Sequence, residues 1–190
     1  MSFRSESKPR GKKPEPLDEA KLYEYAVHAL GRRMRTVVEL KRLMRTRVEE
    51  GEAGDAKILA VVTRLEEQHY LDDPAYAATY TRLRQDNDKF GQRRVQQDLA
   101  RKGVNTELIA TTLNTAYENV SEEELARKHL ERKRVKQPAN EKESARVVRL
   151  LVRGGFSLGV IFKILKSWNL PDETLASLES IDLDESPGPE

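Results

Sequence analysis

Apolar side chains recur every three or four residues along most of this chain, the spacing of one face of an α-helix. Three such stripes are Tyr23, Ala26, Val27, Leu30 and Met34; Tyr76, Tyr80 and Leu83; and Ile161, Ile164, Leu165 and Trp168. No segment alternates with the period of two that a half-buried strand requires. Pro74 and Pro138 are the only prolines between Leu17 and Leu170. The pattern predicts an all-α protein with helices of 11–16 residues joined by short loops.

Side chains that start and stop helices support this prediction. Capping-box spacing, in which the side chains at both ends accept bonds from unpaired amides, occurs at Thr36–Glu39, Ser121–Glu124 and Asn140–Glu143. Asp73 precedes Pro74, which predicts an N-cap followed by proline at the first helical position. Gly154-Gly155 is expected to supply a left-handed helix end, and the acid- and glycine-rich segment 49–55 an exposed loop.

The helices also repeat along the chain. Residues 98–105 can be laid over residues 150–157, a shift of 52, and the same register aligns Ile109 with Ile161 and Leu113 with Leu165. Val61 and Leu65 lie 48 residues before Ile109 and Leu113. We predict three tandem three-helix repeats, at 19–70, 71–119 and 120–170, that form an elongated, curved array because each small unit leans on its neighbours. A disordered basic tail is expected at 1–18 and an acidic tail at 171–190.

Charge is segregated along the chain, although the formal net charge is only +2, from 34 Lys+Arg and 32 Asp+Glu. Residues 172–190 contain no base and the acids Asp172, Glu173, Glu179, Asp182, Asp184, Glu185 and Glu190. Without these seven acids, residues 1–171 carry 34 bases and 25 acids, a formal charge of +9. Such asymmetry indicates nucleic acid, or a protein that works on it, as a partner; a solvated helical surface with a solubilising tail is the alternative.

Residues for catalysis or metal binding are not grouped in this sequence. The absence of cysteine excludes disulfides, thiol nucleophiles and thiolate metal sites. His28, His69 and His129 lack the i, i+4 partner of a zinc-binding helix, and Asp72-Asp73 are better explained as helix N-terminal charges. We therefore predict no catalytic, cofactor or metal site and no enzyme. No apolar run reaches the roughly 20 residues that span a membrane, and we expect a cytoplasmic monomer.

Bases gather in three regions, each around the second helix of a predicted repeat. The candidate binding surface comprises Arg32, Arg33, Arg35, Lys41, Arg42 and Arg45; Arg84, Lys89, Arg93, Arg94, Arg101 and Lys102; and Lys128, Arg132, Lys133, Arg134, Arg146, Arg149 and Arg153. Their recurrence favours a surface for phosphates or an acidic groove over decoration of solvated helix faces. We expect most aromatic side chains to pack in the core, namely Tyr70, Tyr76, Tyr80, Phe156, Phe162 and Trp168. Phe90 is the aromatic residue for which we consider exposure to solvent.

Particular residues resemble the RecX family of bacterial recombinase regulators. The most specific stretch contains His69 to Ala77, Tyr80, Arg84, Lys89-Phe90-Gly91, Arg94-Val95, Leu99 and Lys102-Gly103-Val104. Residues 153–157 with Ile161 and Leu165 are similar to the end of the family's third module, and Ala29-Leu30, Arg33 and Glu39-Leu40 to its opening helices. The likeness covers about residues 20–168. His69 stands where the family usually has glycine, and charged tails extend both ends.

The resemblance implies three tandem three-helix repeats without enzymatic activity. It further implies binding to the RecA recombinase filament on single-stranded DNA, with double-stranded DNA left open, and modulation, mainly inhibition, of RecA ATPase, strand exchange and coprotease activity. These roles belong to DNA repair, recombination and SOS control. We expect Tyr76, Tyr80 and Leu99 to pack in the core. Asp73 is expected to cap a helix, and Gly103 to allow the chain to turn. The rival hypothesis is a helical-repeat protein that binds DNA without sequence preference and has no recombinase partner.

Overall fold

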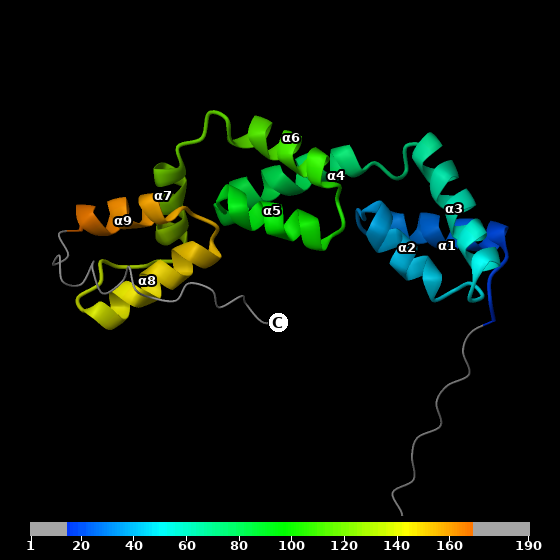
Figure 1. Cartoon of the computed structure of the whole chain (residues 1–190), viewed down its shortest axis with the longest axis horizontal. Coiled ribbons are helices and arrows are strands. Elements are labelled where there is room, and N and C mark those ends of the chain that lie inside the picture. The colour runs from blue at the N-terminus through cyan, green and yellow to red at the C-terminus, as the bar shows by residue number, and fades with distance from the viewer. Residues whose placement is uncertain (1–14, 169–190) are drawn as a thin grey trace, which may run out of the picture. The chain divides into compact units, whose positions relative to one another are not determined.

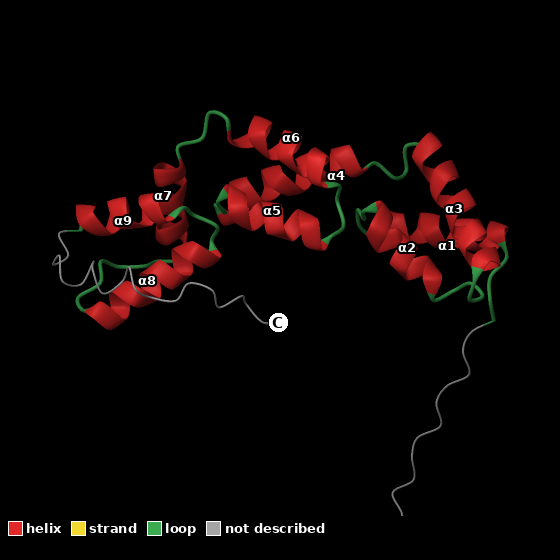
Figure 2. Cartoon of the chain, viewed as in Figure 1, coloured by secondary structure: helices red, strands yellow, loops and turns green. Residues whose placement is uncertain are grey.

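The computed structural model describes residues 15–168, and within this range all regular structure is helical (Figures 1 and 2). This confirms the predicted all-α class. Residues 1–14 and 169–190, which hold nearly all of the two predicted tails, lie outside the described residues. The chain divides into two compact units, one up to Asp72 and one from Asp73 onward. The predicted curved array concerns how these units are arranged and stays a prediction.

The first unit contains α1 (Glu19–Arg32), α2 (Val37–Arg45) and α3 (Glu52–Glu67). Asp18 caps α1 by accepting a bond from the Lys21 amide at 2.9 Å. Thr36 and Glu39 form the predicted capping box at the start of α2. The three helices pack around one core, in which Leu22, Leu40, Met44 and Leu65 have no exposed surface.

The second unit contains six α-helices and one π-helical segment. They are α4 (Asp73–Leu83), the π-helix η1 (Arg84–Asp88), α5 (Gln92–Arg101), α6 (Thr106–Tyr117), α7 (Glu122–Arg132), α8 (Glu141–Arg153) and α9 (Leu158–Ser167). One core joins α4, α5 and α6 around Val95, Leu99 and Leu113, and a second joins α7, α8 and α9 around Leu151 and Ile164. The described residues thus form three helical triplets, each with a core of its own.

Equivalent positions of the predicted repeat lie on the third helix of each triplet. Val61 and Leu65 are on α3, Ile109 and Leu113 on α6, and Ile161 and Leu165 on α9; all six are buried. Each pair is spaced i, i+4, so both side chains face the core of their own triplet. The predicted three-helix repeat is confirmed.

Helix ends follow the sequence signals with small differences. Ser121 and Asn140 accept bonds from the amides of Glu124 and Glu143, the first half of each predicted capping box. Glu143 accepts the Ala139 amide and not that of the N-cap Asn140. Helix α4 begins at Asp73 itself, so Asp73 is its first residue and not its N-cap. The predicted minimum length of 11 residues is wrong, because α2 has nine residues and α5 and α9 have ten.

The segment 49–55 is only partly a loop. Helix α3 begins at Glu52, and Gly54 is buried against the backbone of Glu49. An added Cβ at Gly54 would lie 2.0 Å from the Glu49 carbonyl oxygen. The glycine is therefore needed for close approach of the loop to the first turn of α3, not for loop flexibility.

Four predictions about individual side chains are wrong. Tyr70 is 58% exposed, Met34 52% and Leu83 46%, although the apolar stripes predict core positions for all three. Phe90 is half-buried and packs against the second core, so it is not an exposed aromatic. His69 adopts the left-handed backbone conformation, with φ 57°, which explains why glycine suits this position.

The second and third triplets meet through a close backbone contact. The Gly91 amide donates to the Gly154 carbonyl at 2.8 Å, and Gly155 has a φ of +84°, which confirms the predicted left-handed helix end. A Cβ on Gly155 would lie 2.3 Å from the Arg94 nitrogen. Because no side chain fits at this junction, glycine is what allows the two triplets to touch.

Polar and aromatic groups complete the same junction around His129. The His129 Nδ1–H donates to the Asp88 carbonyl at 2.8 Å, and its ring lies 5.7 Å from the rings of both Phe90 and Phe156. Its side chain is almost wholly buried, and this burial lowers the pKa of His129. Arg132 pairs with the Asp88 carboxylate at 3.1 Å. Second and third triplets are thus fixed to one another within the second unit.

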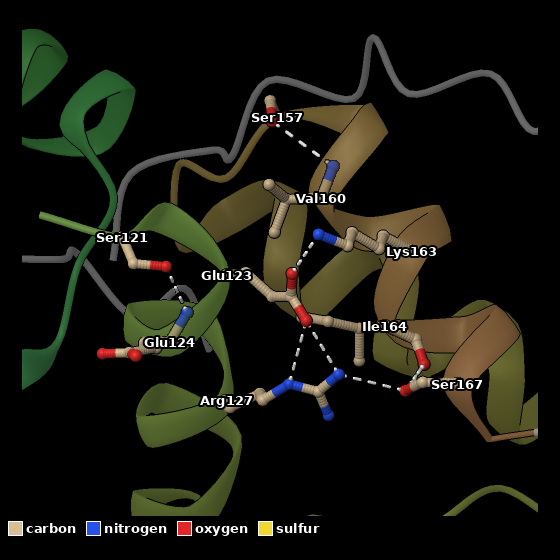
Figure 3. A network of polar contacts seen from close by, with 9 residues as sticks. All are labelled: Ser121, Glu123, Glu124, Arg127, Ser157, Val160, Lys163, Ile164 and Ser167. Atoms are coloured by element: carbon tan, nitrogen blue, oxygen red, sulfur yellow. Dashed lines mark hydrogen bonds and ion pairs between the residues drawn. The ribbon is translucent and has the colours of Figure 1, made fainter.

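Helix α9 is held to α7 by the polar network shown in Figure 3. Glu123 accepts bonds from Lys163 at 2.6 Å and from the Arg127 Nη2 at 3.0 Å. These bonds, that of Lys163 foremost, lower the pKa of Glu123. Arg127 also donates to the Ser167 hydroxyl at 3.2 Å. The C-terminal end of α9 is therefore anchored to α7 within the third triplet.

Candidate functional site

The predicted cations of the first triplet lie at the end of α1 and along α2. All are exposed except Arg35, whose Nε donates to the Ala29 carbonyl at 3.4 Å. Arg45 pairs with Asp55 on α3. Lys41, Arg42, Arg45 and Asp55 line a groove of about 540 Å³ whose apolar lining is Val38, Ile58 and Leu59. We call these seven residues the first groove.

The predicted cations of the second triplet are mostly committed to the fold. Asp98, with a side chain only 9% exposed, pairs with Arg94 at 3.3 Å and with Arg101. Arg84 pairs with Asp88 at 2.8 Å, and this hydrogen bond raises the pKa of Arg84. Arg84, Lys89, Arg94 and Lys102 are half-buried, whereas Arg93 and Arg101 are exposed. Arg84, Arg94 and Arg101, three of the six predicted cations, are thus paired with carboxylates of their own triplet.

Aromatic rings lie beneath three of the second-triplet cations, Arg84, Arg94 and Lys102. Arg84 lies over the Tyr80 ring at 4.8 Å, Arg94 over Phe90 at 5.5 Å, and Lys102 over both Tyr76 and Tyr80 at 5.8 and 5.3 Å. The two tyrosine rings stack on one another at 6.0 Å. Cation–π contacts of this kind order long side chains along the protein surface. The family-like stretch of the sequence is therefore largely structural.

The predicted cations of the third triplet are all exposed: Lys128, Arg132, Lys133, Arg134, Arg146, Arg149 and Arg153. Of these, Arg132 belongs to the junction through Asp88. Arg153 donates to the backbone carbonyl of Arg149 at 3.3 Å. The other six predicted cations are Lys128, Lys133, Arg134, Arg146, Arg149 and Arg153. Within residues 15–168, no carboxylate lies within ion-pairing distance of any of them. The cationic surface of the third triplet is thus less neutralised than that of the second.

Several of these cations surround a groove of about 790 Å³ between α8 and the loop that precedes it. We call it the third groove. Its lining residues are Lys133, Arg134, Val135, Lys136, Gln137, Pro138, Glu143, Arg146, Val147, Leu150 and Arg153. The five cations are exposed, whereas Pro138 and Val147 are buried and Val135 and Leu150 half-buried, so an apolar floor has a cationic rim. The single acid, Glu143, accepts the Ala139 amide at 2.8 Å and serves the start of α8.

Sequence reasoning found most of this rim but missed the floor. Lys136, Gln137 and Pro138 lie in a loop, outside any helical stripe, and their side chains line the groove only because of how the loop folds onto α8. Arg134 has a φ of 54°, a left-handed conformation that the sequence does not signal. Conversely, Lys128 and Arg149 are exposed but do not line the groove.

Other kinds of site are not assembled in the part of the chain that the structure describes. There, no three His, Asp or Glu side chains come together as a metal site would need. None of the helices described is long and apolar enough to cross a membrane. What the described residues offer is a set of cationic surfaces on the triplets of a helical-repeat protein.

Comparison with known proteins identifies the family to which the chain is similar. Residues 72–113 match the family model described as RecX, second three-helix domain. A regulatory protein RecX of Myxococcus xanthus is 32% identical over 174 residues, which are 84% of this chain and 92% of the relative. One of Geobacillus thermodenitrificans is 34% identical over 148 residues, 76% of this chain but 53% of the relative. The chain therefore spans about half the length of that second relative.

Solved structures show the same fold. A crystal structure of regulatory protein RecX has a TM-score of 0.62 at 24% identity, covering 78% of this chain and 71% of that one. RecX from Lactobacillus salivarius has a TM-score of 0.58 at 20% identity, covering 80% of this chain and 97% of that one. The chain belongs to the RecX family of regulatory proteins.

Proposed function

We propose that this chain binds the RecA filament on single-stranded DNA and restrains its ATPase, strand-exchange and coprotease activities. The observation that carries this proposal is the third groove with its neighbouring cations, which stay exposed on a protein of a regulatory family. A filament of recombinase and DNA is a repeating acidic surface, and several weak cationic contacts along it add up to tight binding.

The surfaces of the first and third triplets supply these contacts. Lys41 and Arg42 in the first groove, and Lys133, Arg134 and Arg146 in the third, are exposed cations beside apolar side chains. The cations contact phosphates or carboxylates, and the apolar lining contacts bases or aliphatic side chains. Cations at phosphates provide affinity without sequence preference, which suits a regulator that acts wherever a filament forms.

DNA-dependent ATP hydrolysis by the cognate RecA, measured while this protein is titrated in, tests the proposal. Hydrolysis is expected to fall with added protein, and the variant Lys133→Gln/Arg134→Gln/Arg146→Gln to need a higher concentration for the same effect. Arg93→Gln, an exposed cation of the second triplet outside both grooves, is the control and should inhibit as the parent does. An unchanged hydrolysis rate at saturating protein contradicts the proposal.

The rival function, DNA binding without a recombinase partner, predicts a different result. Direct phosphate binding weakens linearly in a plot of log affinity against log salt. Tight binding to DNA alone at physiological salt, together with unchanged RecA hydrolysis, supports the rival. Inhibition of hydrolysis at salt concentrations where DNA alone is not bound supports the filament as the target.

A further inference from the structure

The third groove is a concave cationic site with an apolar floor, and the C-terminal end of the described chain lies beside it. The Gln137 side chain, which lines the groove, donates to the Trp168 carbonyl at 2.5 Å. Trp168 packs against the core of α7, α8 and α9. Glu123 and Arg127 hold α9 to α7 (Figure 3). The Gln137 bond to Trp168 therefore places the exit point beside the groove.

The sequence that continues from this exit complements the groove in chemistry. Residues 172–190 contain seven acids and no base. Between the acids lie the aliphatic residues Leu175, Leu178, Ile181 and Leu183. Carboxylates suit the rim of Lys133, Arg134, Lys136, Arg146 and Arg153, and aliphatic side chains suit the floor of Val135, Pro138, Val147 and Leu150. A nucleic acid strand would place phosphates at the rim and bases, not aliphatic side chains, on the floor.

The continuing segment is also long enough to follow the groove. Helix α8 has 13 residues and is therefore about 20 Å long. An extended chain covers about 3.4 Å per residue, so the four residues from Trp168 to Asp172 span up to about 14 Å and the 11 to Glu179 up to about 37 Å. The acids can thus reach every cation of the rim without displacing α9.

We propose that residues 172–190 bind in the third groove of the same chain and compete there with an external polyanion. Tethering gives such a segment an effective concentration in the millimolar range, so weak contacts suffice to occupy the groove. Only the competition rests on the proposed function; the intramolecular contact does not. The segment acts as a built-in counterion that limits binding to partners able to displace it.

The contact itself is tested in the full-length chain by NMR of a ¹⁵N-labelled sample. The comparison is with a variant in which Asp172, Glu173, Glu179, Asp182, Asp184 and Glu185 are changed to Asn or Gln. The backbone and Nε–H signals of Arg146 and Arg153 are expected to shift between the two proteins, and those of Arg42 and Arg93, outside the third groove, to stay in place. The indole N–H of Trp168, the only tryptophan of the chain, is a further NMR signal at the exit point and is expected to shift as well. Unshifted groove signals at low salt overturn the proposal.

Competition is tested by the affinity of the same proteins for a fluorescent oligo-dT strand at about 50 mM salt. If the segment fills the groove nine-tenths of the time, neutralising its acids raises the apparent affinity about tenfold. This gain should vanish in the Lys133→Gln/Arg134→Gln/Arg146→Gln background and persist in the Arg93→Gln background. An equal gain in both backgrounds means that the acids act through long-range charge and not from the groove, which overturns the proposal.

The two proposals fail separately. If no variant binds DNA or a RecA filament but the NMR shifts of the groove occur, the proposed function fails and the intramolecular contact stands. If filament binding depends on the groove cations but neutralising the acids moves neither the groove signals nor the affinity, the function stands and the intramolecular contact is wrong. In that case the filament, and not the acidic segment, occupies the groove.

Discussion

The second and third triplets carry nearly equal numbers of predicted binding cations, yet they use them differently. In the second triplet, Asp98 and Asp88 neutralise Arg84, Arg94 and Arg101, and aromatic rings lie under the guanidinium groups. In the third, the cations of the groove rim have no carboxylate within ion-pairing distance among the described residues, and the one acid of the groove caps a helix.

The different use of cations follows from the composition of the two cores. The second has a small core, and its surface is completed by the stack of Tyr76 and Tyr80 with cations above it. The third has the larger core, which includes Phe156 and several aliphatic residues. Similar clusters of bases in sequence can therefore be structural in one repeat and available for binding in the next.

The largest expected effect concerns the junction that joins these two triplets. Gly155→Ala combines a left-handed backbone with a Cβ placed 2.3 Å from the Arg94 nitrogen. Backbone strain and overpacking together should lower the free energy of unfolding by about 3 kcal/mol. Gly159→Ala on α9, where nothing lies within 4 Å of the added Cβ, is the control and should cost nothing measurable. Chemical denaturation measures both, and equal stabilities would refute the close-contact junction.

The next largest effect tests the structural role of the second-triplet cations. Asp98→Asn removes the charge that Arg94 and Arg101 share and weakens a bond that Tyr80 donates at 3.3 Å. A buried carboxylate with several charged donors is worth about 2 kcal/mol of unfolding free energy. Asp86→Asn, an exposed acid in η1, is the matched control. If thermal denaturation finds both variants equally stable, the second-triplet cations are not structural.

A smaller effect is expected from His129, through pH. Because burial lowers its pKa in the folded state, the unfolded state binds the proton more readily, and stability falls as pH drops below the unfolded value of about 6.5. His129→Gln should flatten this loss between pH 7 and 5.5, whereas His28→Gln on the exposed face of α1 should leave it unchanged. Melting temperatures between pH 7 and 5.5 measure this loss of stability. If the melting temperature of His129→Gln depends on pH as the parent's does, His129 is not the group responsible.

Much of the fold could be predicted from the sequence because it depends on local rules. The i, i+4 pairs of α3, α6 and α9, the caps at Thr36, Ser121 and Asn140 and the glycine at 155 all act within one turn of helix. The exposed Tyr70 could not be predicted, since it lies past the end of α3, where the helical stripe no longer points to a core.

The candidate site could be predicted only as a set of cations. Which cations are neutralised depends on contacts between elements, such as Arg132 with Asp88, that no spacing reveals. Asp98 lies three residues before Arg101 and four after Arg94, a helical pairing visible in the sequence, but its burial is a property of the packed triplet. The floor of the third groove likewise arises from a loop folded onto α8.

The most direct test of this contrast is the salt dependence of single-stranded DNA binding by two double variants. Arg146→Gln/Arg153→Gln neutralises two cations of the third groove, and Arg94→Gln/Arg101→Gln neutralises two cations held by Asp98. The groove variant should lower the slope of log affinity against log salt by about 1.4, since each phosphate contact to a single strand contributes about 0.7. The second-triplet variant should keep the parent slope while losing stability. Equal slopes for the two variants, or a larger loss in the second triplet, would contradict the assignment of binding to the third groove.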